Sequence, residues 1–158
     1  MLTTEQLQTL KADIAADETF AGIPHNSDGA WEIAAAYNLA AIPAFVVWKT
    51  DVPTSLCKQA MLWTEYIARS AGERDAWQFM LSNGTINAAD VNVRQGIADV
   101  FSGPGGATTR ANLTAIAKRN ATRAEKLFAT GTGSDASPAT MSFEGSLIYQ
   151  DVLQAWSA

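Results

Sequence analysis

The chain has 158 residues, a net charge of −5, and a composition that is 47% hydrophobic and 17% charged. This length is typical of one domain, and a composition this apolar excludes a chain that is disordered throughout. The apolar runs are well short of the roughly 18 residues that a membrane span needs, so we expect no membrane contact.

The first residues, MLTTEQLQTLK, contain neither the basic leader nor the apolar stretch of a secretory signal. We therefore expect the protein to stay in the compartment in which it is made. The single cysteine agrees with this, because Cys57 has no partner for a disulfide within the chain and lies in a stretch with a helical pattern. We expect it to be a buried, reduced thiol.

The charges are unevenly distributed along the chain. Residues 104–130 carry five basic residues and one acid, for a net charge of +4, whereas residues 131–158 have a net charge of −3 and residues 1–60 of −4. An acidic chain with one basic stretch argues against general nucleic-acid binding and suggests complementary faces on neighbouring subunits. Four basic residues are candidates for lining a DNA channel or for contacts between subunits: Arg110, Lys118, Arg119 and Arg123.

The first predicted helix has clear start and stop signals. Thr3 and Gln6 have the spacing of a capping box, and the helix should end near Asp17. Its apolar face consists of Leu7, Leu10 and Ile14.

The turn-rich stretch 22–29 should lead into a second helix that carries Trp31 and Tyr37. Between residues 41 and 52 the helical period is lost. This segment is either a short buried strand or an irregular connection, and the pattern leaves both open.

The helical pattern returns at Thr54 with an apolar stripe that includes Trp63, and a capping box at Ser70 and Glu73 predicts the next helix, with Trp77 on its inner face. We expect Trp63 and Trp77 to be packing residues. Three more helices are predicted, one opened by Asn92, one over residues 109–120, and a short one capped by Thr122 and Glu125.

The remainder, residues 131–158, is different in kind. Glycine, serine and proline precede a short alternating run, and there are too few apolar residues in register for a separate core. We expect an extended arm whose apolar side chains dock either on this subunit's helices or on a neighbour's. The candidate docking residues are Met141, Phe143, Leu147, Ile148, Tyr149, Val152 and Trp156. The predicted fold is therefore mainly α, a helical bundle over residues 1–130 with an extended C-terminal arm over 131–158 that contains a short β segment.

Catalytic chemistry has little support in the sequence. His25 is the only histidine, which excludes a histidine-rich metal site, and the glycine-rich runs lack the Lys-Ser or Lys-Thr of a phosphate-binding loop. The acid pairs Asp17-Glu18 and Glu73-Asp75 could be imagined in an enzyme that cleaves peptidoglycan, but helix caps and helix ends explain them more simply. We expect no cofactor and no enzymatic activity.

Residues 121–152, ATRAEKLFATGTGSDASPATMSFEGSLIYQDV, resemble a stretch of small structural proteins of tailed bacteriophages and prophages. Residues 1–37 and 86–97 are similar to the same group, so the resemblance covers most of the chain. No catalytic motif carries over from it.

Within that group, the predicted layout resembles head–tail connector (adaptor) proteins. This resemblance implies a virion protein made in the host cytoplasm, which forms a homo-oligomeric ring beneath the portal. Its partners would be the portal protein and tail or stopper proteins, with transient contact to genomic DNA. Two alternatives stay open: another structural role, such as a minor capsid, cement or tail-completion protein, and a small muralytic hydrolase.

Overall fold

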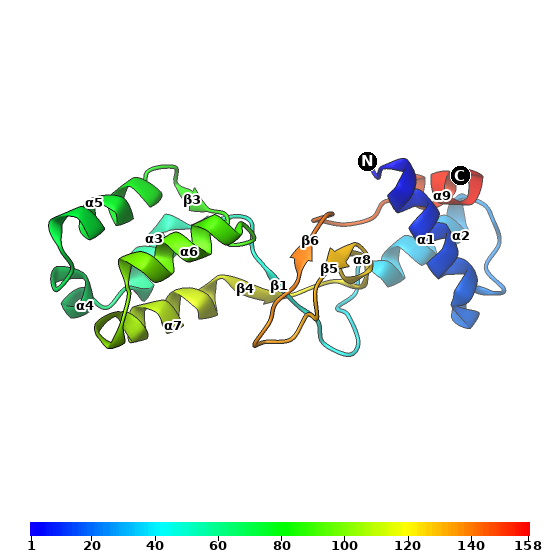
Figure 1. The fold of residues 1–158 in the computed structure, drawn as a ribbon. Coiled ribbons are helices and arrows are strands. Elements are labelled where there is room, and N and C mark those ends of the chain that lie inside the picture. The colour runs from blue at the N-terminus through cyan, green and yellow to red at the C-terminus, as the bar shows by residue number, and fades with distance from the viewer. The chain divides into compact units, whose positions relative to one another are not determined.

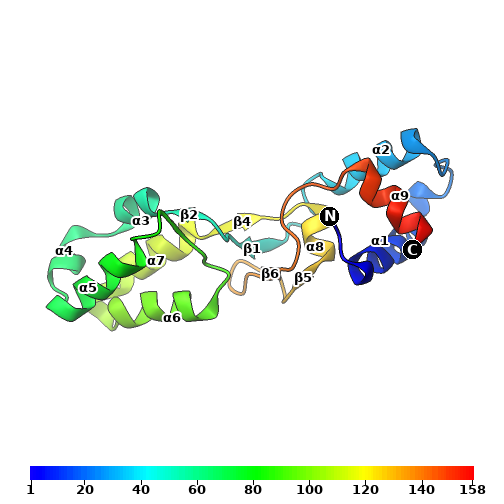
Figure 2. The same cartoon turned by 90° about the horizontal axis from the view of Figure 1, so that it is seen from above.

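The computed structural model describes residues 1–158, and the chain forms two compact units (Figures 1 and 2). Unit 1 combines Met1–Val46 with Asn120–Ala158, and unit 2 is the continuous segment Val47–Arg119. Nine α-helices account for most of the regular structure and all strands are short, so the mainly α fold is confirmed. None of the helices is long and apolar enough to span a membrane.

The division of the chain differs from the predicted body over residues 1–130 and arm over 131–158. Residues 47–119 bury a core of their own, while residues 131–158 belong to unit 1 together with the first 46 residues. The chain passes between the units within two strands that pair with each other, β1 (Val46–Trp48) and β4 (Lys118–Asn120).

Unit 1 is built from five helical segments and one small antiparallel sheet, in which Ala129 pairs with Met141 and Thr130 with Thr140. Its elements are α1 (Thr4–Ala16), η1 (Glu18–Phe20), α2 (Ser27–Tyr37), α8 (Arg123–Leu127), β5 (Ala129–Thr130), β6 (Thr140–Met141) and α9 (Tyr149–Ser157).

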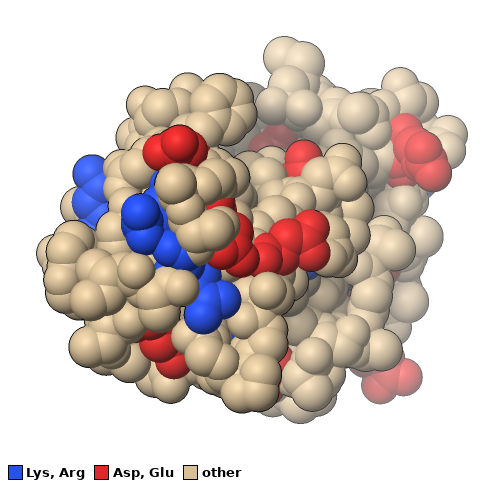
Figure 3. Space-filling view, turned by 60° about the vertical axis from the view of Figure 1, so that its left-hand side comes forward, with Lys and Arg blue, Asp and Glu red and all other residues tan.

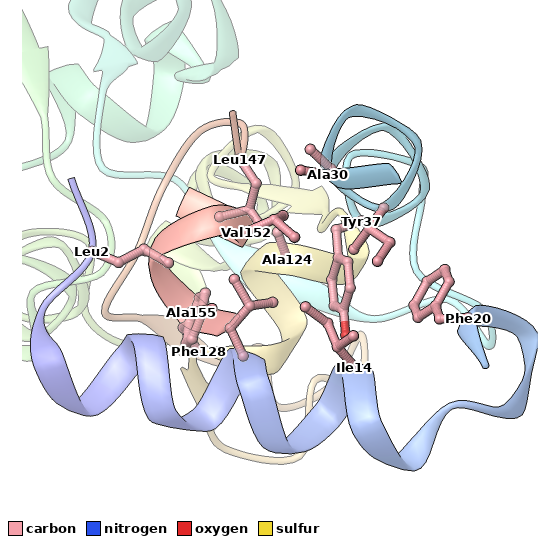
Figure 4. Packing of buried hydrophobic residues seen from close by; sticks show 13 residues of the cluster. Leu2, Ile14, Phe20, Ala30, Tyr37, Ala124, Phe128, Leu147, Val152 and Ala155 are labelled. Carbon is pink, nitrogen blue, oxygen red and sulfur yellow. The ribbon is translucent and has the colours of Figure 1, made fainter. Parts of the chain in front are cut away.

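The core of unit 1 lies between α1, α2, α8 and α9, whose labelled side chains point toward one another in Figure 4. Leu10 and Ile14 of α1, Tyr37 of α2 and Val152 of α9 are all buried in it. Burying an apolar side chain of this size contributes roughly 1.5–3 kcal/mol, so residues from both ends of the chain stabilise the same core.

The capping box at the start of α1 is present as predicted. The Thr3 hydroxyl accepts a hydrogen bond from the Gln6 amide at 3.2 Å, and the Gln6 side chain accepts one from the Thr3 amide at 2.9 Å. Asp17 ends the helix and begins η1, because its carboxylate accepts from the Thr19 amide at 2.9 Å. These side chains satisfy backbone groups that a helix end leaves without partners.

The end of the chain departs from the extended arm that was predicted, because Tyr149–Ser157 forms the helix α9. The Ile148 amide donates to the Asp151 carboxylate at 2.9 Å, which starts this helix. Just before it, the Asn38 side chain donates to the Leu147 carbonyl at 2.9 Å and accepts from the Leu147 amide at 2.8 Å. The short β segment of the predicted arm is β6.

Unit 2 has a separate core around Trp77 and Phe101, whose rings meet edge to face with their centroids 5.2 Å apart. An antiparallel pair, Val52 with Ile86 and Pro53 with Thr85, joins β2 to β3. The elements are β2 (Val52–Pro53), α3 (Thr54–Ala60), α4 (Trp63–Ile67), α5 (Ala71–Met80), β3 (Thr85–Ile86), α6 (Val91–Val100), η2 (Pro104–Gly106) and α7 (Ala107–Ile116).

The helix predicted from Thr54 onward is broken into α3 and α4. Met61 is extended, and the Leu62 amide donates to the Thr109 hydroxyl at 3.1 Å instead of continuing the helix. This break turns the end of the apolar stripe outward, and Trp63 is 63% exposed. The expectation that Trp63 is a packing residue is therefore wrong, whereas Trp77 is fully buried as predicted.

Candidate functional site

A group of charged side chains in unit 1 surrounds Arg123 of α8. Its guanidinium contacts the Asp13 carboxylate at 3.0 Å and the Asp17 carboxylate at 2.7 Å. The same guanidinium lies 4.2 Å from the centre of the Tyr37 ring and 5.1 Å from that of Phe20. A planar guanidinium suits such a place because it can bond two carboxylates and also stack on aromatic rings.

This network fixes the protonation of its members. Hydrogen bonds from the Thr19 hydroxyl and amide, and then from Arg123, lower the pKa of Asp17 to about 2. Burial, followed by the hydrogen bond to Asp13, raises the pKa of Tyr37 above its usual range. Asp17 is therefore charged and Tyr37 neutral at physiological pH, and the ion pairs connect α8 to α1.

A pocket of about 610 Å³ lies next to this network within unit 1. Apolar side chains supply much of its wall, including Leu39 and Ile42, and Ile42 is 92% exposed. Its ionisable lining residues are Asp13, Arg123 and Lys126, two of which already bind each other. Thr19 also lines the pocket, and its hydroxyl donates to the Asp17 carboxylate at 2.7 Å. The apolar part of the wall suits binding of an apolar group.

The four basic residues predicted for a channel or an interface are divided between the units. Arg110, Lys118 and Arg119 lie in unit 2 and Arg123 in unit 1. Arg110 donates to the carbonyls of Phe101 and Gly103, and Arg123 is held by its two carboxylates. The Arg110 and Arg123 guanidinium groups thus bond groups of their own unit, a use that the count of charges along the chain does not reveal.

Most of the predicted docking residues face the chain's own core. Leu147 and Val152 are buried, Phe143, Tyr149 and Trp156 pack against the same cluster, and Met141 pairs with Ala129 in the small sheet. The sequence left open whether these residues dock on this subunit's helices or on a neighbour's. In the structure they pack on this subunit's own helices. Ile148 is the one member of the set that is largely exposed.

Two aromatic stacks join α9 to the region of α2. The His25 and Trp156 rings stack with centroids 4.3 Å apart, and the Trp31 and Tyr149 rings with centroids 5.3 Å apart. Trp156 therefore anchors the last helix to its own unit.

One member of each acid pair weighed for hydrolysis, Asp17 and Glu73, caps a helix. The Glu73 carboxylate accepts from the Ser70 hydroxyl and amide, both at 2.7 Å, and these bonds lower the pKa of Glu73. The pKa of Asp17 is lowered as well, whereas a general acid needs a raised one. Cys57 is buried, and burial raises the pKa of its thiol, which disfavours the reactive thiolate.

Large apolar side chains on the surface are the feature that sequence reasoning missed. Trp63, Ile67 and Phe79 of unit 2 are each more than half exposed, as are Trp31 and Leu39 of unit 1. Their spacing is that of core residues, so the periodicity gives no signal of their exposure. Groups of exposed apolar side chains mark contact sites on protein surfaces.

Comparison with protein-family models, with curated proteins and with solved structures found no match to this chain.

Proposed function

We propose that this protein is a structural subunit of a tailed-phage virion that works by assembling with other proteins. Within that class we propose a head–tail connector, a homo-oligomeric ring beneath the portal. The observation that carries the proposal is the exposure of large apolar side chains on both units, among them Trp31, Leu39, Ile42, Trp63 and Phe79. Side chains of this kind are favourable contact residues once a partner removes them from water.

The chemistry of the polar residues supports a role in assembly. Of the carboxylates considered for hydrolysis, Glu73 caps α5 and Asp17 binds Arg123, and apolar side chains supply much of the wall of the large pocket of unit 1. The resemblance of residues 121–152 to phage structural proteins points in the same direction.

The structure changes how residues 131–158 enter this proposal. Because Leu147 and Val152 complete the core of unit 1, these residues hold the subunit together, and the surfaces for partners lie on the folded units. Truncation at Gly131 would remove part of that core, so loss of assembly after truncation would not by itself identify a docking arm.

Binding to the portal tests the proposal. The purified chain would be mixed with the portal protein of the same virus, passed over a size-exclusion column, and the complex imaged by electron microscopy. We expect co-elution and a ring of subunits on the portal. Co-elution with a capsid or tail protein instead would assign another structural role, and clearing in a peptidoglycan zymogram would overturn the structural assignment.

A further inference from the structure

The two units carry opposite net charges. Unit 1 contains ten acidic and three basic residues, a net charge of −7, whereas unit 2 contains six acidic and eight basic residues, a net charge of +2. This division is not visible from the linear sequence, because unit 1 is assembled from both ends of the chain. Opposite charges of this size attract at long range and raise the rate of encounter.

The outer side of α2 is acidic and aromatic. Asp28, Trp31, Glu32 and Ala35 are all exposed, and their i, i+3, i+4, i+7 spacing places them on one side of the helix. We name these four residues the α2 face. Trp31 is 59% exposed although one side of its ring stacks on Tyr149.

Neither carboxylate of the α2 face has an ion-pair partner in the structure; the ion pairs of unit 1 that involve Arg123 use Asp13 and Asp17 instead. The α2 face therefore offers two unpaired negative charges beside an exposed indole. A surface that combines guanidinium groups with apolar side chains would complement it, because arginine bonds carboxylates and stacks on tryptophan.

Unit 2 has such a surface at α4. Trp63 and Ile67, four residues apart on α4, are 63% and 53% exposed. Arg69 lies just after α4 and Arg74 in α5, and both are partly buried. The Arg74 guanidinium donates to the carbonyls of Ile67 and Arg69, which holds it against the end of α4. We name Trp63, Ile67, Arg69 and Arg74 the α4 face.

The two guanidinium groups of the α4 face donate to backbone carbonyls. Arg69 donates to the carbonyls of Ser102 and Gly105, each at 3.1 Å. The carboxylates of Glu65 and Glu73 accept from the amides at the starts of α7 and α5, and the charge of Arg69 contributes to the lowered pKa of Glu73. Figure 3 shows Lys and Arg side chains gathered in one group on the surface of unit 2 turned toward the viewer, next to Asp and Glu side chains.

We propose that the α2 face of one copy of this chain binds the α4 face of the next copy. The partner is a second copy because both complementary faces occur on the same chain, in equal number, and carry opposite charge. Two different faces make a heterologous contact, which generates rings or filaments and not closed dimers. This inference rests on the proposed function, for which it supplies the contact between neighbouring subunits.

Two variants that each block one face provide the test. Asp28→Lys with Glu32→Lys reverses the charge of the α2 face, and Trp63→Ala with Ile67→Ala removes the apolar part of the α4 face. We expect each variant alone to raise the dissociation constant for self-association by about tenfold or more, as loss of interface anchors does. Mixed one to one, the two variants should form a heterodimer and nothing larger, because one intact face remains on each.

Matched controls separate this contact from effects of net charge and general hydrophobicity. Glu5→Lys with Glu18→Lys makes the same charge change in unit 1 outside the α2 face, and Val91→Ala trims an exposed apolar side chain of unit 2, 64% accessible, outside the α4 face. Both controls should associate like the wild type by sedimentation velocity, and circular dichroism should show that all variants are folded.

The outcomes distinguish this inference from the proposed function. If the wild type assembles, alone or on the portal, but the face variants associate as well as the controls, the pairing of the two faces is overturned and the structural role stands. A mixture of the two blocked variants that stays monomeric would also overturn it. If the wild type stays monomeric with and without the portal, both the pairing and the connector function fail.

Discussion

Arg123 shows how one side chain connects elements that are far apart in sequence. Its guanidinium contacts Asp13 and Asp17 and also lies against the rings of Phe20 and Tyr37. It therefore attaches α8 to the N-terminal helices of unit 1. A residue that the sequence offered as a DNA-channel or interface residue is used here for stability.

We expect Arg123→Ala to lower the free energy of unfolding by about 1–2 kcal/mol, since the ion pairs are partly exposed and each contributes modestly. Arg123→Lys should lose less stability than Arg123→Ala, because an ammonium keeps the positive charge. It should still be less stable than the wild type, because an ammonium does not bond both carboxylates as a planar guanidinium does. Urea denaturation of both variants checks this order. Equal stability of Arg123→Ala and wild type would show that the network is energetically neutral.

The Asp17 carboxyl makes the stability of the protein depend on pH. Folding lowers its pKa from 3.8 to about 2, so its contribution is present above about pH 4 and is lost as the pH falls toward about 2. Asp17→Asn should therefore be less stable than wild type at about pH 5, with the difference shrinking toward about pH 2. Urea midpoints at the two pH values measure it, and a difference that does not change with pH would contradict this assignment.

At the scale of elements, α9 completes the core of unit 1 although it is the last helix of the chain. The adjacent residues Leu147 and Ile148, just before α9, offer a matched pair, because Leu147 is buried in the core of unit 1 whereas Ile148 is 52% exposed. We expect Leu147→Ala to destabilise the protein by about 2–4 kcal/mol, the usual result of a cavity in a core. Ile148→Ala should change the stability by less than about 0.5 kcal/mol.

Thermal unfolding of the two variants is the measurement. Similar losses at both positions would mean that α9 is not packed as described. If neither substitution had an effect, the segment would be the extended arm that the sequence predicted.

Elements with strong local signals were predictable from the sequence. The capping boxes at Thr3, Ser70 and Thr122 each start a helix where predicted, because side chain and backbone within one turn determine them. The helix α9 was missed because Ile148, the residue at its N-cap position, has no side chain that can cap a helix. The Asp151 carboxylate, three positions later, accepts a hydrogen bond from the Ile148 amide instead. Only the core of unit 1 explains why that segment is helical.

The candidate surfaces were less predictable than the helices. Trp63 continues an apolar stripe in the sequence, and its exposure depends on the bond between the Leu62 amide and the Thr109 hydroxyl, a partner 47 residues away. Likewise, Arg123 is bound by Asp13, a partner 110 residues away in the sequence. Periodicity and charge counts contain no information about such partners.

At the scale of the whole molecule, unit 2 is inserted between the two parts of unit 1 in sequence. Local patterns do not show that residues 1–46 and 120–158 share a core, so a single helical body was the simpler prediction. The insertion has a consequence for folding, since residues 47–119 are continuous and bury their own core of Trp77, Phe101 and Leu113.

We expect a fragment of residues 47–119 to fold alone, with helical circular dichroism, dispersed amide resonances and a cooperative thermal transition. Residues 1–46 without 120–158 should stay unfolded, because α8 and α9 would be missing from their core. An unfolded 47–119 fragment would show that unit 2 depends on the rest of the chain.

The claim that the protein acts by assembly is tested most directly by its mass in solution. Light scattering would give the molar mass of the purified chain over a range of concentrations, alone and with a small amount of portal protein from the same virus. If the protein acts by assembly, we expect a mass several times that of one chain, at least when the portal is present, and a ring in images of the same sample. A single-chain mass at every concentration, unchanged by the portal, would contradict it.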